Sequence, residues 1–364
     1  MRKDKWKPVK LGNVFKLKSG NALPVSKHIE GNIPVYGGNG IMGYHNALMI
    51  NKPTISIGRV GTPGAVYITK EKAWITDNAL YPIEYYEEVD QYFLAELLRN
   101  LRIDKLAQKT AQPSISQTII SNIDTILPPL EEQKQIAALF QSTETAMEQV
   151  DGQEKNLLQF KNKLLRDLFS DKKEFGNHLT AKDFETVRFD KIAINISERV
   201  EPKKTELTTY VGLEHLDSDN LVIERTGIPD DVIGTKLKIY KGDIIFGKRR
   251  AYLRKVAVSH FDGIASAHSM ILRANEKHIE KDFLPFFMQS DAFMQRAVQI
   301  SEGSLSPTIK VKTLAQQEFT LPKKEKQKEL VALFKQLDET RQQLKQQKAT
   351  LKLLKQKLLN EILG

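Results

Sequence analysis

The feature that most constrains this chain is a long helical pattern that occurs twice. The segment LPPLEEQKQIAALF, which begins at Leu127, returns as LPKKEKQKELVALF at Leu321. Aligned without gaps at an offset of 194 residues, residues 127–170 and 321–364 are identical at 15 of 44 positions. Agreement over such a length indicates an internal duplication, so we expect the fold to contain the same long element twice.

Each copy is predicted to be a long helix with one apolar seam. The Leu-Pro pair ends an extended segment, because the residue before a proline is disfavoured in a helix. Beyond it, apolar residues recur at every seventh position, with a second row three residues further on, which is the pattern of a coiled coil. The predicted seam contains Ile136, Leu139, Val150, Leu157 and Leu164 in the first copy, and Leu330, Leu337, Leu344, Leu351 and Leu358 in the second.

The two helices are predicted to pair with each other as an antiparallel coiled coil with pseudo-two-fold symmetry. A helix of about 40 residues extends about 60 Å, and so long and narrow a seam needs a partner. Residues 127–170 carry 5 basic and 7 acidic side chains, whereas residues 321–364 carry 11 and 5. These opposite net charges favour pairing between the copies. Gln153 and Gln347 lie near the helix midpoints, where they would either meet as a polar layer that fixes the register or face water.

The segments before the helices also match each other. ISIGRVGTPGAVYI from Ile55 parallels IIFGKRRAYLRKVAV from Ile244, and the later segments WITDNALYPI and GIASAHSMILRA correspond. PSISQTII from Pro113 is placed over GSLSPTIK from Gly303, so that the second copy runs four residues longer near 311–320. Short β-branched runs split by turn residues indicate mixed strands, with one helix in each copy.

The sequence therefore predicts an α+β chain of two similar mixed α/β domains, each followed by a long helix. The predicted boundaries are 1–126 for the first domain, 127–175 for the central helix, 176–320 for the second domain and 321–364 for the C-terminal helix.

Composition favours an anionic partner and a reducing compartment. The chain has 55 Lys and Arg against 45 Asp and Glu, a net charge of +10, which suits nucleic acid. It has no cysteine, so disulfides and thiolate metal sites are excluded. No apolar run is long enough to span a bilayer, and the first residues lack the apolar region of a signal peptide. We expect a soluble cytoplasmic protein.

Catalytic and metal-binding patterns are missing from the sequence. YGGNGIMGYH is rich in glycine but lacks the spacing of a cofactor loop, and ILPPLEE lacks the amide–aromatic pair of a methyltransferase. Pro229-Asp230 is not followed by the Asp/Glu-x-Lys of a nuclease, and the seven histidines show no paired helical spacing. We therefore predict a non-catalytic chain without a metal site.

Several longer segments together resemble one family. IPVYGGNGIMGYHN, IGRVGTPGAVYI, AWITDNALYP, GDIIFGKRRAYLRKVAVSHFDGIASAHSMIL and the two Leu-Pro-x-x-Glu-x-Gln helix openings are similar to the specificity subunit of type I DNA restriction–modification systems. The resemblance implies two target-recognition domains, each of which reads one half of a bipartite, asymmetric DNA site. It also implies that the helices act as a spacer and as the docking surface for two modification subunits.

The resemblance assigns the chemistry to other chains. Methyltransferase activity would belong to the modification subunits, and a separate restriction subunit would translocate and cut the DNA. No cofactor is expected in this chain, while S-adenosylmethionine, ATP and Mg are expected on the partner subunits. The target sequence is not implied, because base preference belongs to variable regions of the family.

Basic and polar segments supply the candidate DNA contacts. GKRRAYLRK mixes cations with an aromatic side chain, as DNA-binding surfaces do, although a charged strand edge that prevents aggregation is the alternative. In the first copy Arg59 aligns with Lys248, and Asn78 aligns with His268. The candidates are Tyr36, Asn39, Tyr44, His45, Asn46, Arg59, Lys109, Gln112, Ser114, Ser116, Lys248, Arg249, Arg250, Tyr252, Arg254, Ser304, Ser306, Thr308 and Lys310. The hydroxyl-rich loops among them would bind phosphates or serve as turns before the helices.

Two other functions remain as alternatives. A self-sufficient restriction–methylation enzyme would need the catalytic motifs that the sequence lacks. A coiled-coil scaffold that binds nucleic acid would show no base preference and would have no methyltransferase partner.

Overall fold

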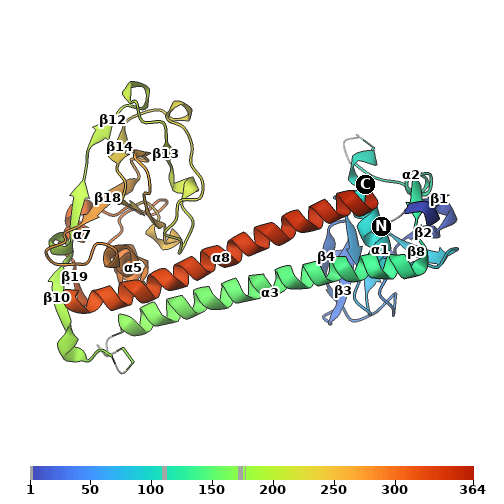
Figure 1. Cartoon of the computed structure of the whole chain (residues 1–364), viewed down its shortest axis with the longest axis horizontal. Helices are drawn as coiled ribbons and strands as arrows, with labels where there is room; N and C mark the ends of the chain where they lie inside the picture. The colour runs from blue at the N-terminus through green and yellow to red at the C-terminus, as the bar shows by residue number, and fades with distance from the viewer. Residues whose placement is uncertain (1–2, 109–112, 171–174, 177) are drawn as a thin grey trace. The chain divides into compact units, whose positions relative to one another are not determined.

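The chain folds into two compact units (Figure 1). The computed structural model describes residues 3–108, 113–170, 175–176 and 178–364. Unit 1 comprises Met1–Asp151 and Gln346–Gly364, and unit 2 comprises Gly152–Lys345. Because the division cuts both long helices near their middles, each unit contains one half of each helix.

Unit 1 contains three sheets with the strand orders β1-β9, β2-β8-β5-β6 and β4-β3-β7. Its strands are β1 (Lys7–Lys10), β2 (Phe15–Ser19), β3 (Ile33–Gly37), β4 (Gly40–His45), β5 (Ile55–Gly58), β6 (Val66–Ile68), β7 (Trp74–Ile75), β8 (Ala79–Tyr85) and β9 (Asp124–Leu127). Its helices are α1 (Gln91–Asn100), α2 (Gln117–Ser121) and the first half of α3 (Leu130–Leu168).

Unit 2 contains three sheets with the orders β10-β19, β11-β18-β15-β16 and β12-β14-β17-β13. The strands are β10 (Phe184–Arg188), β11 (Ala193–Ile196), β12 (Arg199–Val200), β13 (Tyr210–Val211), β14 (Lys236–Ile239), β15 (Ile244–Gly247), β16 (Val256–Val258), β17 (Gly263–Ala265), β18 (Ser269–Ala274) and β19 (Glu318–Pro322). The helices are α4 (Phe189–Ile192), α5 (Phe283–Gln289), α6 (Asp291–Gln299), α7 (Val311–Ala315) and the first half of α8 (Lys324–Leu363).

Two of the three sheets have the same topology in both units. The antiparallel pair β1-β9 corresponds to β10-β19, and each pair leads directly into a long helix. The four-stranded order β2-β8-β5-β6 corresponds to β11-β18-β15-β16, antiparallel throughout. The third sheets differ in strand number and pairing, so the copies have diverged most there. The prediction of two similar mixed α/β domains, each followed by a long helix, is confirmed.

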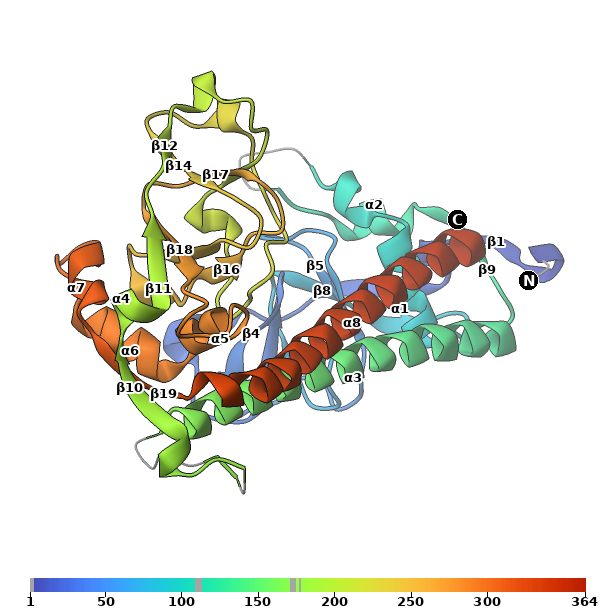
Figure 2. The ribbon, with the colours of Figure 1, turned by 60° about the vertical axis from the view of Figure 1, so that its left-hand side comes forward.

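The long helices pair antiparallel inside each unit. In unit 1 the beginning of α3 and the end of α8 enter one core, which contains Ile136, Phe140, Leu358 and Leu363. In unit 2 the end of α3 and the beginning of α8 enter the other core, which contains Leu165, Leu168, Leu330 and Phe334. Figure 2 shows this end of α8 next to α5 in unit 2. Each helix end is therefore stabilised by a globular core as well as by the other helix.

A buried glutamine joins the start of each long helix to its own unit. Gln133 accepts a hydrogen bond from Asp90 N at 2.9 Å and donates to Pro128 O at 2.9 Å. Gln327 makes the same two bonds, from Glu280 N and to Pro322 O, both at 2.8 Å. These glutamines are the last residue of the Leu-Pro-x-x-Glu-x-Gln opening, so the repeated motif has a structural role.

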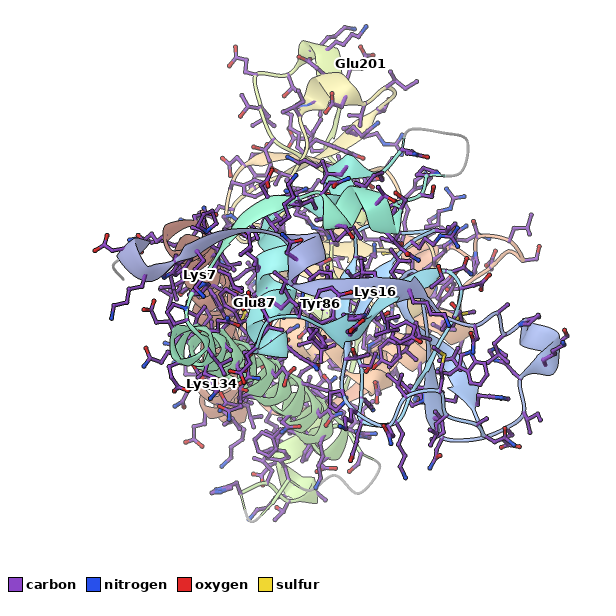
Figure 3. All side chains as sticks on the ribbon, turned by 90° about the vertical axis from the view of Figure 1, so that its right-hand side faces the viewer. Lys7, Lys16, Tyr86, Glu87, Lys134 and Glu201 are labelled. Atoms are coloured by element: carbon purple, nitrogen blue, oxygen red, sulfur yellow. The ribbon has the colours of Figure 1, made fainter. Side chains whose placement is uncertain are left out.

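Figure 3 looks onto unit 1 at the start of α3. Lys134 on the helix and Tyr86 and Glu87, from the segment between β8 and α1, lie on this face. The three residues line one hollow, which places the β8–α1 segment against the first turns of the helix. The two bonds of Gln133 secure the same junction.

A lysine–carboxylate pair also recurs at the repeat offset. In unit 2 Lys161 of α3 donates to both oxygens of Asp338 of α8. In unit 1 Lys355 of α8 donates to Glu144 of α3. Both members of the second pair are displaced from the first by the repeat offset, so one interaction has been kept twice with the helices exchanged. These pairs set the register of the antiparallel helices within each unit.

The predicted seam residues differ in burial. Ile136, Val150 and Leu330 are buried, Leu157, Leu164, Leu337, Leu344, Leu351 and Leu358 are half-buried, and Leu139, Gln153 and Gln347 are exposed. Leu139 is exposed because the neighbouring Phe140 points into the core of unit 1 in its place. The exposure of Gln153 and Gln347 favours the alternative in which both face water.

Candidate nucleic-acid interface

In unit 2 the loop after β15 is fastened to a hairpin just before α7. Arg250 N donates to Pro307 O at 2.8 Å, and Ile309 N donates to Lys248 O at 3.0 Å. The guanidinium of Arg250 also donates to Ser306 Oγ at 3.2 Å. The basic segment GKRRAYLRK and the hydroxyl-rich segment GSLSPTIK thus form one surface. We call it the basic surface of unit 2.

Lys248, Arg249 and Arg250 gather on the basic surface without acidic partners among the described residues. Arg249 Nη1 lies 3.3 Å from His268 Nε2, so that nitrogen accepts and the imidazole is neutral. Burial lowers the pKa of Lys248, and the nearby Arg199 lowers it further. Within the described part of the chain, neither these residues nor Arg250 forms an ion pair. Clustered like charges repel each other, so the surface favours a polyanion.

The pKa of His268 reports the same positive potential. Burial of part of the ring lowers this pKa first, although the side chain stays largely exposed. Arg249, Lys248 and Lys236 lower it further. Arg199 on β12 is exposed and belongs to the basic surface, whereas Lys236 on β14 is buried and donates to the carbonyls of Ile233 and Gly234. Arg199 was not among the predicted contacts, because it lies far before the basic segment in the sequence.

Arg254, in contrast, is occupied by structural contacts. Its guanidinium donates to Asp219 and Asp291 at 2.9 Å each and to Gln289 O at 2.6 Å. These bonds satisfy the charge inside unit 2, so the side chain is not available to a phosphate. The prediction of Arg254 as a DNA contact is therefore replaced by a structural role, in which Arg254 holds the loop in place. Lys310 likewise has a partner, since its ammonium lies 2.6 Å from Glu302.

The other candidates in unit 2 lie at the edge of the basic surface. Tyr252 and Ser304 are exposed, whereas Ser306 and Thr308 are half-buried. Thr308 Oγ1 donates to Ser306 O at 3.1 Å and so supports the hairpin. Among these four candidates, Tyr252 and Ser304 therefore have the most exposed side chains.

Unit 1 repeats the backbone plan of this surface. Arg59 N donates to Asn78 O at 2.8 Å, as Lys248 N donates to His268 O at 3.1 Å. Ile115 N donates to Arg59 O at 3.0 Å, which matches the bond from Ile309 to Lys248. The predicted equivalences of Arg59 with Lys248 and of Asn78 with His268 are confirmed. Exposed Arg59 is also held by a 3.3 Å bond from Nη1 to Asp77 O.

The predicted alignment of the two hydroxyl-rich loops is wrong by four residues. Ser114 bridges Val60 in unit 1, and Thr308 bridges Arg249 in unit 2. Ser114 therefore corresponds to Thr308, and Pro113 corresponds to Pro307 instead of Gly303. The extra residues of the second copy lie before the hairpin, not near 311–320. In the segment before the hairpin, unit 1 has α1 and a turn at Ile103–Leu106, whereas unit 2 has the two helices α5 and α6.

The polar segment around β3 and β4 in unit 1 is divided between interior and surface. Tyr36 is buried and its hydroxyl accepts from Lys70 N at 3.2 Å. His45 is buried as well, and its Nδ1 accepts from Ile29 N at 3.1 Å. Both side chains are buried inside unit 1, so they do not belong to its exposed candidate interface. Asn39, Tyr44 and Asn46 are exposed.

The hydroxyl-rich loop of unit 1 contains a helix cap. Ser116 Oγ accepts from Ile119 N at 3.2 Å at the start of α2, which is the turn function considered for this loop. Ser114 is half-buried. Lys109 and Gln112 lie outside the described residues. Beside this loop, a Cβ added to Gly61 would meet no atom within 4 Å, so the backbone there is open to a ligand.

The described part of the chain is residues 3–108, 113–170, 175–176 and 178–364. These residues contain no group of three or more His, Cys, Asp and Glu side chains that could hold a metal ion. None of the helices in this part is long and apolar enough to cross a membrane.

Comparison with known proteins identifies the family. The type I restriction modification DNA specificity domain matches residues 3–159 and 203–353. The type I restriction enzyme MjaVIII specificity subunit of Methanocaldococcus jannaschii is 23% identical, over 98% of this chain and 92% of that protein. The EcoDI specificity subunit of Escherichia coli is 25% identical, over 91% of this chain and 81% of that one.

Solved structures show the same fold. The S subunit of the type I restriction–modification system from M. genitalium aligns with a TM-score of 0.65 at 18% identity, over 99% of this chain and 96% of that one. A chain from a structural study of type I complex assembly aligns with a TM-score of 0.61 at 14% identity, over 98% and 97%. This chain belongs to the type I restriction modification DNA specificity family. Within it, the chain is a specificity subunit, a non-catalytic component of such a system.

Proposed function

We propose that this chain reads a bipartite, asymmetric site on double-stranded DNA and directs modification and restriction subunits to it. The basic surface of unit 2 carries the proposal, because Lys248, Arg249 and Arg250 are held close together without acidic partners among the described residues. Phosphates would neutralise these charges and supply affinity, while neighbouring polar side chains supply base selection. In this proposal the segments 1–126 and 176–320 are the target-recognition domains, and 127–175 and 321–364 are the spacer helices.

The proposed DNA site is asymmetric because equivalent backbone positions in the two units carry different side chains. Arg59 and Asn78 in unit 1 occupy the places of Lys248 and His268 in unit 2. The exposed groups of unit 1, Asn39, Tyr44 and Asn46, lie on a sheet whose strand order differs from that in unit 2. Two surfaces with different donors and acceptors select different base pairs, so the two half-sites differ in sequence.

Two modification subunits dock on the helices in this proposal. Phe160 of α3 and its repeat equivalent Leu354 of α8 are 50% and 45% exposed, respectively. The same apolar position is thus left open once in each unit, which suits two copies of one partner. S-adenosylmethionine, ATP and Mg belong to the partner subunits, and the assembly works in the cytoplasm.

The test is a single-molecule methylation map of host DNA with the gene intact and deleted. Loss of one bipartite adenine-methylated motif on deletion is the expected result, and it also reveals the target sequence. Complementation with the wild-type gene should restore the motif, whereas a gene carrying Lys248→Gln and Arg249→Gln should restore it poorly. A motif that persists in the deletion strain would refute the proposal.

A further inference from the structure

Unit 2 exposes one leucine almost completely beside its cations. Leu305 is 90% exposed, the largest value among the large hydrophobic side chains of the described residues. It lies at the tip of the hairpin that carries Ser304 and Ser306. Single exposed leucines are common on protein surfaces, but this one lies beside the cations of the basic surface, where a bound polyanion would cover it.

The leucine is presented by a well-defined hairpin. Glu302 N donates to Thr308 O at 3.0 Å, and Thr308 N donates to Glu302 O at 2.9 Å. Gly303 adopts a φ of +104°, which permits the tight turn between these residues. With the bonds from Arg250 to Pro307 and Ser306, the tip is fixed relative to the cations. Leu305 is therefore held at a fixed place beside the cations.

We propose that Leu305 is a specificity-determining residue that contacts the 5-methyl group of a thymine in the major groove. This inference rests on the proposed function. The major groove is wide enough for a two-stranded β-ribbon, and this hairpin, closed by the single bridge between Glu302 and Thr308, is no wider than one. Thymine presents there the one apolar group on a base edge, and aliphatic side chains contact it. The neighbouring cations and hydroxyls bind the phosphates that flank the groove.

The experiment uses the full chain with its co-purified modification subunits and a duplex that carries the mapped target site. Each thymine of the two half-sites is replaced in turn by deoxyuridine, which removes the methyl group alone. At one position we expect the wild-type complex to lose affinity about fourfold, the effect of one buried methyl group. The Leu305→Ala complex should bind more weakly overall and should show no further loss at that position.

The control is Leu353→Ala, which removes the same atoms from a leucine on α8 that is 71% exposed. This variant should retain the wild-type response to deoxyuridine. Equal deoxyuridine losses for wild type and Leu305→Ala at every position would overturn the inference, as would a target without a responsive thymine. Specific binding that persists in either case leaves the proposed function intact. A wild-type complex that binds no duplex specifically would refute both.

A base-stack wedge is the competing role for an exposed leucine, and it has its own signature. A 2-aminopurine placed beside the responsive thymine should show the same fluorescence with wild type and Leu305→Ala. Strong unstacking with wild type alone would overturn the methyl contact and assign Leu305 to a wedge.

Discussion

The ammonium group of Lys161 lies 2.6 and 2.8 Å from the two carboxylate oxygens of Asp338, and its side chain is only 4% exposed. Gln289 Oε1 accepts a third bond from it at 3.0 Å. Burial lowers the pKa of Lys161, and Asp338 opposes that effect. The contacts join α3, α8 and α5 inside unit 2, so the register of the helices depends on a charge that is kept out of water.

Removal of one partner should therefore be costly. Asp338→Ala leaves a buried ammonium without its carboxylate, and we expect the unfolding free energy of unit 2 to fall by about 3 kcal/mol. Replacing both residues, as Lys161→Met with Asp338→Leu, should recover most of that loss because no unpaired charge remains. Urea unfolding monitored by hydrogen exchange of unit 2 amides would measure both. A double variant as unstable as Asp338→Ala would contradict this reasoning.

Gln327→Ala should loosen the start of α8. The change leaves Glu280 N and Pro322 O without their partner, and an unsatisfied buried polar group costs about 1–3 kcal/mol. Exchange at the first turns of α8 should rise accordingly. Gln347→Ala is the matched control, since that glutamine is exposed on the same helix and should have almost no effect. Similar exchange in both variants would show that the buried bonds do not stabilise the junction.

The sequence predicted the helices well because their signal is periodic and local. It predicted individual seam positions less well, because a strict heptad describes a helix that contacts only another helix. Each end of α3 and α8 also packs on a globular core, which widens the apolar face to include the i, i+4 position. Phe140 is therefore buried while Leu139 is exposed.

The candidate interface was predictable in position but not in detail. The basic segment after β15 is on the surface, yet Arg254 is neutralised by Asp219 and Asp291, which are 35 and 37 residues away. Partners at such separations come from the tertiary fold and leave no local pattern. The two hydroxyl-rich loops were also misaligned. Their similar compositions allow more than one alignment, and only the backbone pairing of Ser114 and Thr308 identifies the correct one.

Arg249 and Arg254 of unit 2 should have different roles, the first in DNA binding and the second in stability. Arg249→Gln removes a charge from the basic surface, so the magnitude of the slope of log affinity against log salt should fall by about 0.9, for every DNA sequence alike. Thermal stability should hardly change. Arg254→Gln should instead lower stability, because Asp219 and Asp291 lose their partner. Fluorescence anisotropy with labelled duplexes over a salt series and thermal melting separate the two effects. An unchanged slope for Arg249→Gln would exclude it from the interface.

His268 should make DNA binding depend on pH. In the free chain its pKa lies below the ordinary 6.5, through burial and then the neighbouring cations. Phosphates on the basic surface would offset those cations and raise the pKa in the complex. The complex then binds more protons than the free chain, so affinity should increase as the pH falls between the two pKa values. Affinity measured from pH 5.5 to 8 would test this, and His268→Gln should flatten the profile.

Without DNA, protonation of His268 should lower the stability of the chain, whereas in the complex it should favour binding. A histidine whose pKa is depressed by folding binds its proton more readily in the unfolded chain. The contribution of His268 to stability is therefore present above pH 6.5 and is lost as the pH falls through the depressed value. The melting temperature of wild type should decline in this range more than that of His268→Gln. A steeper decline for the variant would contradict the shift.

Phe160 and Leu354 should each control the docking of one modification subunit. Phe160→Asp places a charge at the exposed apolar position of unit 2, and desolvating that charge in an interface is unfavourable. We expect native mass spectrometry to show one modification subunit per chain for Phe160→Asp, one for Leu354→Asp and none for the double variant. Ile228→Asp, at a position 52% exposed outside both long helices, is the control and should retain two. Two subunits bound to the double variant would mean that docking uses another face of the helices.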